Sequence, residues 1–490
     1  MCGLGTFWLA TFIACAAAVS SSELLGQAEL TWYSLGELVS TEVAPTNPCG
    51  VRARHSTDDQ ARSLTGYATV IAIDLANSAV QNSTLVHLLD CLSVEELTLD
   101  GCGSISHSTM MKVCSTPTLK RLYVRGDMPW SEGCAVRLKK CCALEVLDIS
   151  AECWRTGATD ERDPELLSFG WDYILSITSL KELRCRGRPS FMDDSAQLLS
   201  NHEKIEHVDA FGCRLSGRGV AEILKAKQLK YLDVGLGGVA AGRNSVDPQD
   251  RLTPQVVQRL LQLPLLHTVG IAYRGGLDDD AVFAWVCQGK RALRHVDVRG
   301  CSDLTNVACH WFSQCKSIES INLIDCSNIS RDGIYHLSKL RTLSTVEFGG
   351  VAYRSSKYFG DVLSVLSATS RVKTIGVGLN IESSIDWDAL PDVSDCEKVR
   401  IVSGVASGSV QEVAWNAIQK CAKVKCIELF ECQVELASKN LEVPSAGNGV
   451  TYRFVRSFVP NARQEALEAQ LTKVAQVEIS TYEYWVLNSE

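Results

Sequence analysis

One apolar phrase, apolar-x-x-apolar-x-apolar, recurs about every 25 residues over most of the chain. It begins at Val70, Val94, Leu119, Leu144, Leu180, Ile205, Leu229, Leu266, Leu293, Ile318, Leu343, Val372, Cys396 and Val424, and more weakly at Gly449 and Val474. Most intervals between successive starts are 24 to 29 residues, and two are 36 and 37. A chain with one ordinary packed core does not need this regularity, so the repeat constrains the fold more than any other feature.

A fixed period of this length with this phrase is typical of leucine-rich repeats. Alternation over the phrase predicts a short strand, and the helical spacing that follows predicts a helix on the outer side. For example, Ser330 is placed to cap a helix whose Ile334, Leu337 and Leu340 share one face. No repeat can bury its own apolar side, but stacked repeats share one core. We therefore predict an α/β leucine-rich-repeat solenoid, a curved horseshoe of about 14 to 16 repeats, with parallel strands on the concave face and helices on the convex face.

Two rows of cysteine accompany the phrase. One row lies eight residues after the phrase begins, at Cys102, Cys213, Cys301, Cys326 and Cys432. The other lies three residues before the next phrase, at Cys91, Cys141, Cys315 and Cys421. Other repeats carry Ser78, Asp127, Glu152 or Arg188 in the first row. Cysteine suits a turn because it is small, usually buried, and offers a weak S–H donor to the backbone.

In these two rows the sequence resembles the cysteine-containing leucine-rich-repeat family, the repeat type of F-box and leucine-rich-repeat proteins, over about four fifths of the chain. The resemblance implies a protein-binding solenoid. An F-box would belong in residues 23–67, but only Glu23-Leu24-Leu25 and Trp32 are similar to that module, so no F-box is recognisable.

The chain divides into four segments. Residues 1–22 are hydrophobic and carry no charge, which fits a signal, a membrane anchor or a cap on the first repeat. Residues 23–67 are an N-terminal flanking or capping region with an amphipathic helix expected over residues 24–39. The repeat domain covers 68–480. Residues 481–490 form a tail that completes the C-terminal cap, with Tyr482, Tyr484 and Trp485.

The compartment stays open at this point. The 21 cysteines include no C-x-x-C pair, and only nine histidines accompany them, which argues against a finger-type zinc site. Cysteines that repeat at core positions are most simply buried thiols, as in the cytoplasm or nucleus. The uncharged N-terminal segment favours instead the secretory pathway or a membrane tether. A net charge of -9 argues against generic nucleic-acid binding, so we expect no nucleic-acid partner.

Motifs of catalysis are missing from the sequence. It contains no phosphate-binding Gly-rich loop with its Lys, no H-E-x-x-H and no G-x-S-x-G. The glycines at 235, 237 and 238 follow a predicted strand, but a polar loop comes next where a dinucleotide site needs a helix. We expect no enzyme activity, and no catalytic, cofactor-binding or metal-binding residues.

The concave face is the expected binding surface, because the third, fifth and seventh residues of each phrase point away from the core. These positions carry charged and aromatic side chains that are common anchors of interfaces. The predicted partner-binding residues are Arg121, Tyr123, Arg125, Arg184, Arg186, Asp209, Phe211, Tyr231, Asp233, Asp297 and Arg299. The alternative is that Arg184 and Asp209 pair across adjacent strands and the rest is solvated surface. Two insertions, residues 151–165 and 235–251, are expected to form loops on one rim.

The sequence thus favours a non-enzymatic scaffold or adaptor that binds a protein partner of unknown identity through the concave face and rim loops. Two alternatives are a substrate-recognition subunit of a ubiquitin ligase, and a secreted or membrane-tethered recognition protein that would touch the membrane only through residues 1–22.

Overall fold

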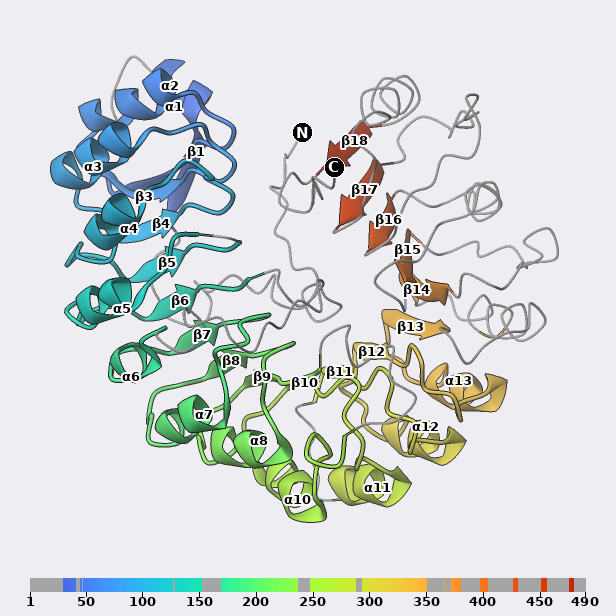
Figure 1. Ribbon diagram of the computed structural model, residues 1–490. Coiled ribbons are helices and arrows are strands. Elements are labelled where there is room, and N and C mark those ends of the chain that lie inside the picture. Colours follow the sequence, from blue (N-terminus) through green and yellow to red (C-terminus); the bar gives the residue numbers. More distant parts are fainter. Residues whose placement is uncertain are drawn as a thin grey trace, which may run out of the picture. The chain divides into compact units, whose positions relative to one another are not determined.

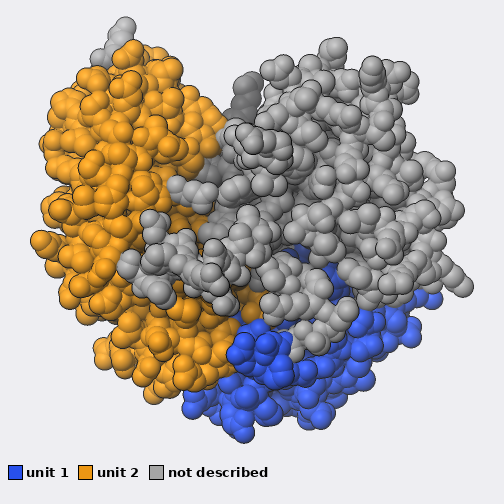
Figure 2. All heavy atoms as spheres, viewed as in Figure 1, with its two compact units in different colours: residues 1–18, 238–490 blue, residues 19–237 orange. Residues whose placement is uncertain are grey.

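The computed structural model shows a leucine-rich-repeat solenoid built from parallel strands and helices. It describes residues 30–40, 45, 47–126, 128–151, 169–236, 247–287, 293–349, 365, 372–379, 397–403, 426–430, 451–455 and 476–479. The chain forms two compact units, unit 2 with residues 19–237 and unit 1 with residues 238–490 and 1–18 (Figure 2).

Unit 2 contains nine described strands, each paired in parallel with the next. The strands are β1 Thr31–Ser34, β2 Cys49–Arg52, β3 Val70–Asp74, β4 Glu96–Thr98, β5 Arg121–Tyr123, β6 Val146–Asp148, β7 Glu182–Arg184, β8 His207–Asp209 and β9 Tyr231–Asp233. The helices are α1 Leu35–Ser40, α2 Asp58–Arg62, the 3-10 helix Ser63–Gly66, α3 Asn82–Cys91, α4 His107–Val113, α5 Glu132–Leu138, α6 Trp171–Ile174, α7 Asp193–Leu199 and α8 Gly217–Ile223. The helices α3 to α8 lie on one side of the strands (Figure 1).

Unit 1 repeats this arrangement, with nine described strands that pair in parallel in chain order. The strands are β10 Thr268–Gly270, β11 His295–Asp297, β12 Ser320–Asn322, β13 Thr345–Gly349, β14 Thr374–Leu379, β15 Lys398–Ser403, β16 Cys426–Phe430, β17 Thr451–Val455 and β18 Gln476–Ile479. Its described helices are α10 Pro254–Gln262, α11 Asp279–Cys287, α12 Asn306–Phe312 and α13 Arg331–Leu337.

The phrase sets the register of the sheet. Each strand from β3 to β18 contains the third residue of one phrase, and within each unit that residue pairs with the third residue of the next. In the repeat of β5 the fourth and sixth residues of the phrase, Leu122 on the strand and Val124 just after it, are completely buried. A buried leucine of this kind contributes about 1.5 to 3 kcal/mol, so the array is stabilised repeat by repeat.

The parallel array begins before Val70. Strand β2 pairs in parallel with β3, and its Val51 and the following Ala53 are 0% and 1% exposed, as in the later repeats. The helix expected over residues 24–39 is wrong in the described part, because Thr31–Ser34 forms β1 and the helix α1 begins only at Leu35.

Several expectations lie outside the described residues. These are the hydrophobic segment 1–22, most of both insertions, and the tail 481–490. In the described part of the chain, no helix has the length and apolar character needed to cross a bilayer.

Candidate protein-interaction face

The face of the sheet opposite the helices carries the third, fifth and seventh residues of each phrase. On β5, Arg121 and Tyr123 flank the buried Leu122 and are partly exposed. This alternation is the normal consequence of pleated strands that pack one face on a core.

Only four of the eleven predicted partner-binding residues are partly exposed. These are Arg121, Tyr123, Arg125 and Arg184, on β5 and β7 or in the residues that follow β5. The other seven are buried, namely Arg186, Asp209, Phe211, Tyr231, Asp233, Asp297 and Arg299. The expected exposure is therefore wrong for most of the strip, and in unit 1 both predicted residues are among the buried ones.

Ion pairs order the partly exposed part of this face. Arg125 lies between two buried carboxylates, with Nε 2.8 Å from Oδ2 of Asp100 and 3.5 Å from Oδ2 of Asp148. Arg184 pairs with Glu182 on its own strand and lies 3.9 Å from Asp148. Burial raises the pKa of Asp100, and the positive charge of Arg125 opposes that rise. The guanidinium groups are thus held in fixed positions by their partners.

A second cluster lies beside it, around Arg186. Its Nε donates to Asp209 at 3.1 Å, and its Nη2 donates to Asp233 at 2.8 Å. Its guanidinium carbon is 4.5 Å from the centre of the Phe211 ring, a cation–π distance. Burial lowers the pKa of Arg186, but the two carboxylates outweigh this effect and the pKa lies above its ordinary value. Asp209 therefore pairs with Arg186, whereas the sequence suggested Arg184.

The fifth position of the phrase has a structural role that the sequence analysis missed. Its buried carboxylate or amide oxygen accepts the backbone N–H two residues later, at 3.0 to 3.3 Å, where each strand ends. The residues are Asp74, Asp148, Asp209, Asp233, Asp297 and Asn322. The signal was present in the sequence as Asp or Asn recurring at one position, and it explains these residues without any partner.

The ninth position supports the turn in the same way. The thiols of Cys102, Cys213 and Cys326 each donate at 3.1 Å to a backbone carbonyl in the preceding repeat. Where the cysteine is replaced, Ser78 and Arg188 donate to the equivalent carbonyl. The eighth position has a left-handed backbone in repeat after repeat, which is why glycine precedes the cysteine so often.

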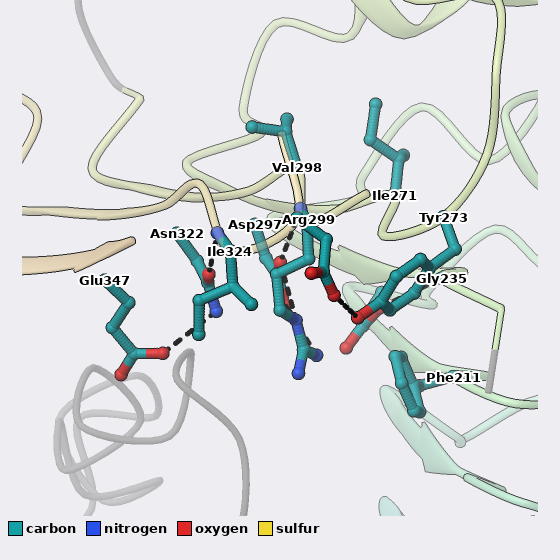
Figure 3. A network of polar contacts seen from close by, with 12 residues as sticks. Phe211, Gly235, Ile271, Tyr273, Asp297, Val298, Arg299, Asn322, Ile324 and Glu347 are labelled. Atoms are coloured by element: carbon teal, nitrogen blue, oxygen red, sulfur yellow. Dashed lines mark hydrogen bonds and ion pairs between the residues drawn. The ribbon is translucent and has the colours of Figure 1, made fainter. Parts of the chain in front are cut away.

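In unit 1, the side chains on the same face of the sheet contact one another through ion pairs and hydrogen bonds (Figure 3). Asp297 pairs with Arg299 at 2.9 Å, and Nδ2 of Asn322 donates to Glu347 at 3.0 Å. A Cβ on Gly376 would lie 2.1 Å from Cγ of Glu347, so that glycine leaves room for the Glu347 side chain. All four polar side chains are at most 5% exposed.

The described cysteines are all free thiols, and most of them are buried. Cys91, Cys142 and Cys287 are exposed. The expectation of buried thiols at the repeated positions is therefore wrong for Cys91, whereas Cys142 and Cys287 belong to neither row. Burial raises the pKa of Cys102 to about 12, so this thiol stays protonated and is a poor nucleophile and metal ligand. Among the residues that the structure describes, no group of three or more His, Cys, Asp or Glu side chains could hold a metal ion.

Comparison with known protein families and with curated proteins finds no match. Among solved structures, the chain is similar to one in the crystal structure of the Rad7 and Elc1 complex in yeast. The two share 14% sequence identity with a TM-score of 0.40, over 81% of this chain and 86% of that chain.

Proposed function

We propose that the chain is a non-enzymatic scaffold that binds a protein partner through the partly exposed sheet face of unit 2. The observation that carries this proposal is the set of half-buried arginines on β5 and β7, each held by carboxylates in a fixed position. Side chains that are already ordered lose little conformational entropy on binding, and arginine is a frequent interface anchor. The repeat type that we assign is the cysteine-containing one, on the strength of the ninth-position hydrogen bonds.

A paired variant tests the proposal without unfolding the chain. Nη1 of Arg121 lies 3.1 Å from Oε2 of Glu96, with both side chains less than one fifth exposed. The double variant Glu96→Ala/Arg121→Ala removes both partners, so neither charge is left alone in a half-buried site. Proteins captured by the tagged full-length chain, identified by mass spectrometry, should lose the partner when this variant is used. Unchanged capture would refute the binding face.

The matched control lies directly before the same two strands. Lys120 immediately precedes β5, Glu95 immediately precedes β4, and the two form a 2.8 Å pair with both side chains more than a third exposed. The double variant Glu95→Ala/Lys120→Ala should leave partner capture intact. A triple variant of predicted partner-binding residues, Arg125→Ala/Arg186→Ala/Tyr231→Ala, is unsuitable because it would remove buried ion pairs and lower stability.

The ligase alternative requires an adaptor-binding module in residues 23–67. There the described residues form the parallel strands β1 and β2, the helices α1 and α2, and a 3-10 helix. The Trp32 ring covers Gly50, where an added Cβ would lie 2.6 Å from the ring. Co-purification of the chain with a cullin adaptor would nevertheless support that function.

Asn82-Ser83-Thr84 is a glycosylation sequon, so the secreted alternative can be tested at Asn82. Its Oδ1 accepts the Ser106 N–H at 2.7 Å and its Nδ2 donates to the Ser104 carbonyl at 3.0 Å, so a glycan there would have to displace a contact between repeats. Detection of a glycan on Asn82 in the purified chain would nevertheless favour the secreted alternative.

A further inference from the structure

The helices α11, α12 and α13 are neighbours in unit 1 (Figure 1). They carry exposed apolar and aromatic side chains. Phe283 is 42% exposed, Val307 is 50% exposed and Tyr335 is 53% exposed. The buried sides of the same helices already contribute Trp285, Phe312 and Leu337 to the core. The exposed side chains are therefore additional to those that the fold needs.

These side chains form a continuous surface, which we call the aromatic band. It consists of Phe283, Val307, His310, Trp311, Tyr335 and His336. The Phe283 and Trp311 rings are 4.6 Å apart between centroids, and Trp311 is 5.0 Å from His310. His310 is 5.0 Å from His336 on the next helix. Exposed contiguous patches rich in Trp, Tyr and Phe are typical of protein interaction sites.

The two edges of the band carry opposite charge. At the N-terminal ends of the helices lie Asp279, Asp280 and Asp332, with Arg331 beside Asp332. At and beyond the C-terminal ends lie Lys316, Lys339 and Arg341, all exposed. The Lys339 ammonium is 4.4 Å from the centre of the Tyr335 ring, so it borders the band directly.

We propose that the aromatic band binds a second copy of this chain through a two-fold axis that runs across the three helices. Such an axis makes the helices antiparallel across the contact and sets the acidic edge of one copy against the basic edge of the other. Asp332 of each copy then faces Lys339 of the other, while the aromatic rings meet in the centre. An axis along the helices would instead join edges of like charge, which is unfavourable.

Sedimentation velocity of the full-length chain tests the contact at concentrations up to about 1 mM. We expect a monomer–dimer equilibrium. Tyr335→Ser and Val307→Ser should each weaken the dimer about tenfold, because they remove exposed apolar area at the centre of the contact without disturbing the core. Leu198→Ser on α7 is the matched control, since Leu198 is 43% exposed on a helix of unit 2. It should leave the dimer unchanged.

Charge exchange tests the antiparallel arrangement. Lys339→Glu and Asp332→Lys should each weaken the dimer, and the two together in one chain should restore it, because each copy supplies both charges. A monomer at about 1 mM, or a dimer that tolerates the band variants, would overturn the proposal. Single reversals that the double variant does not rescue would also overturn it.

Discussion

Asp209 combines two roles that substitutions can separate. It is 1% exposed, its Oδ1 accepts the Phe211 N–H at 3.3 Å, and its Oδ2 accepts from Arg186 at 3.1 Å. Asp209→Ala removes both contacts and leaves Arg186 with Asp233 alone. Removing one partner of a buried ion pair costs about 3 to 5 kcal/mol of unfolding free energy. We expect a loss in that range.

Asp209→Asn keeps an acceptor for the Phe211 N–H, as Asn322 does for Ile324 at 3.0 Å in another repeat. It also keeps a neutral acceptor for Arg186. The loss of unfolding free energy should therefore be smaller than for Asp209→Ala by about 1 to 3 kcal/mol, the range for a buried donor left without its partner.

Urea denaturation followed by far-ultraviolet circular dichroism measures both losses. Glu222→Ala is the control, because the Lys225–Glu222 pair on α8 lies at the surface and should contribute under about 0.5 kcal/mol. Equal losses for Asn and Ala would show that the N–H acceptor contributes nothing. Losses below about 0.5 kcal/mol for both, a value typical of surface sites, would refute the buried network itself.

Three further predictions concern single buried positions in other repeats. Cys213→Ser should keep its hydrogen bond and stability, whereas Cys213→Ala should cost about 1 kcal/mol in urea denaturation, because a buried carbonyl loses its donor. Gly300→Ala should cost clearly more than Gly126→Ala in melting experiments, because both glycines have positive φ but only a Cβ at 300 meets a ring carbon, at 2.1 Å. Burial lowers the pKa of His295 to about 4, so the folded chain binds that proton less tightly than the unfolded chain and loses stability as pH falls from about 6.5 to 4. His295→Gln should reduce this loss by about 2 kcal/mol at pH 5, measured by denaturation across that range, and an unchanged pH dependence would contradict it.

The sequence was sufficient for the strand array because one phrase sets both the position and the register of every strand from β3 to β18. The sequence pattern did not reveal the repeat at β2, because its phrase begins at Pro48 and has Ala53 where most later repeats have a larger residue. The structure identifies the repeat at β2 by the buried Val51 and Ala53 and by the left-handed backbone of His55, the eighth residue of its phrase.

The exposure of individual side chains at the candidate site could not be predicted from the repeat phrase. Neighbouring strands lie about 4.8 Å apart, so long side chains reach one or two strands away and bury each other. Arg186 reaches Asp233, which is 47 residues later and two strands along. Arg184 and Asp209 are register partners, yet Asp209 binds Arg186 and Arg184 binds Glu182. Strand pairing alone does not determine which of several nearby charges will meet.

The two proposed surfaces differ in charge, so the salt dependence of binding distinguishes them. The region of unit 2 around β5 and β7 carries four carboxylates and three guanidinium groups, a sum of -1, in Glu96, Asp100, Asp148, Glu182, Arg121, Arg125 and Arg184. A nearly neutral face gains little from long-range attraction, so partner capture there should change little between low and physiological salt. The aromatic band joins two exposed edges of opposite charge, and screening should weaken that dimer as salt rises. If partner capture and self-association showed the same salt dependence, that result would indicate that one surface makes both contacts.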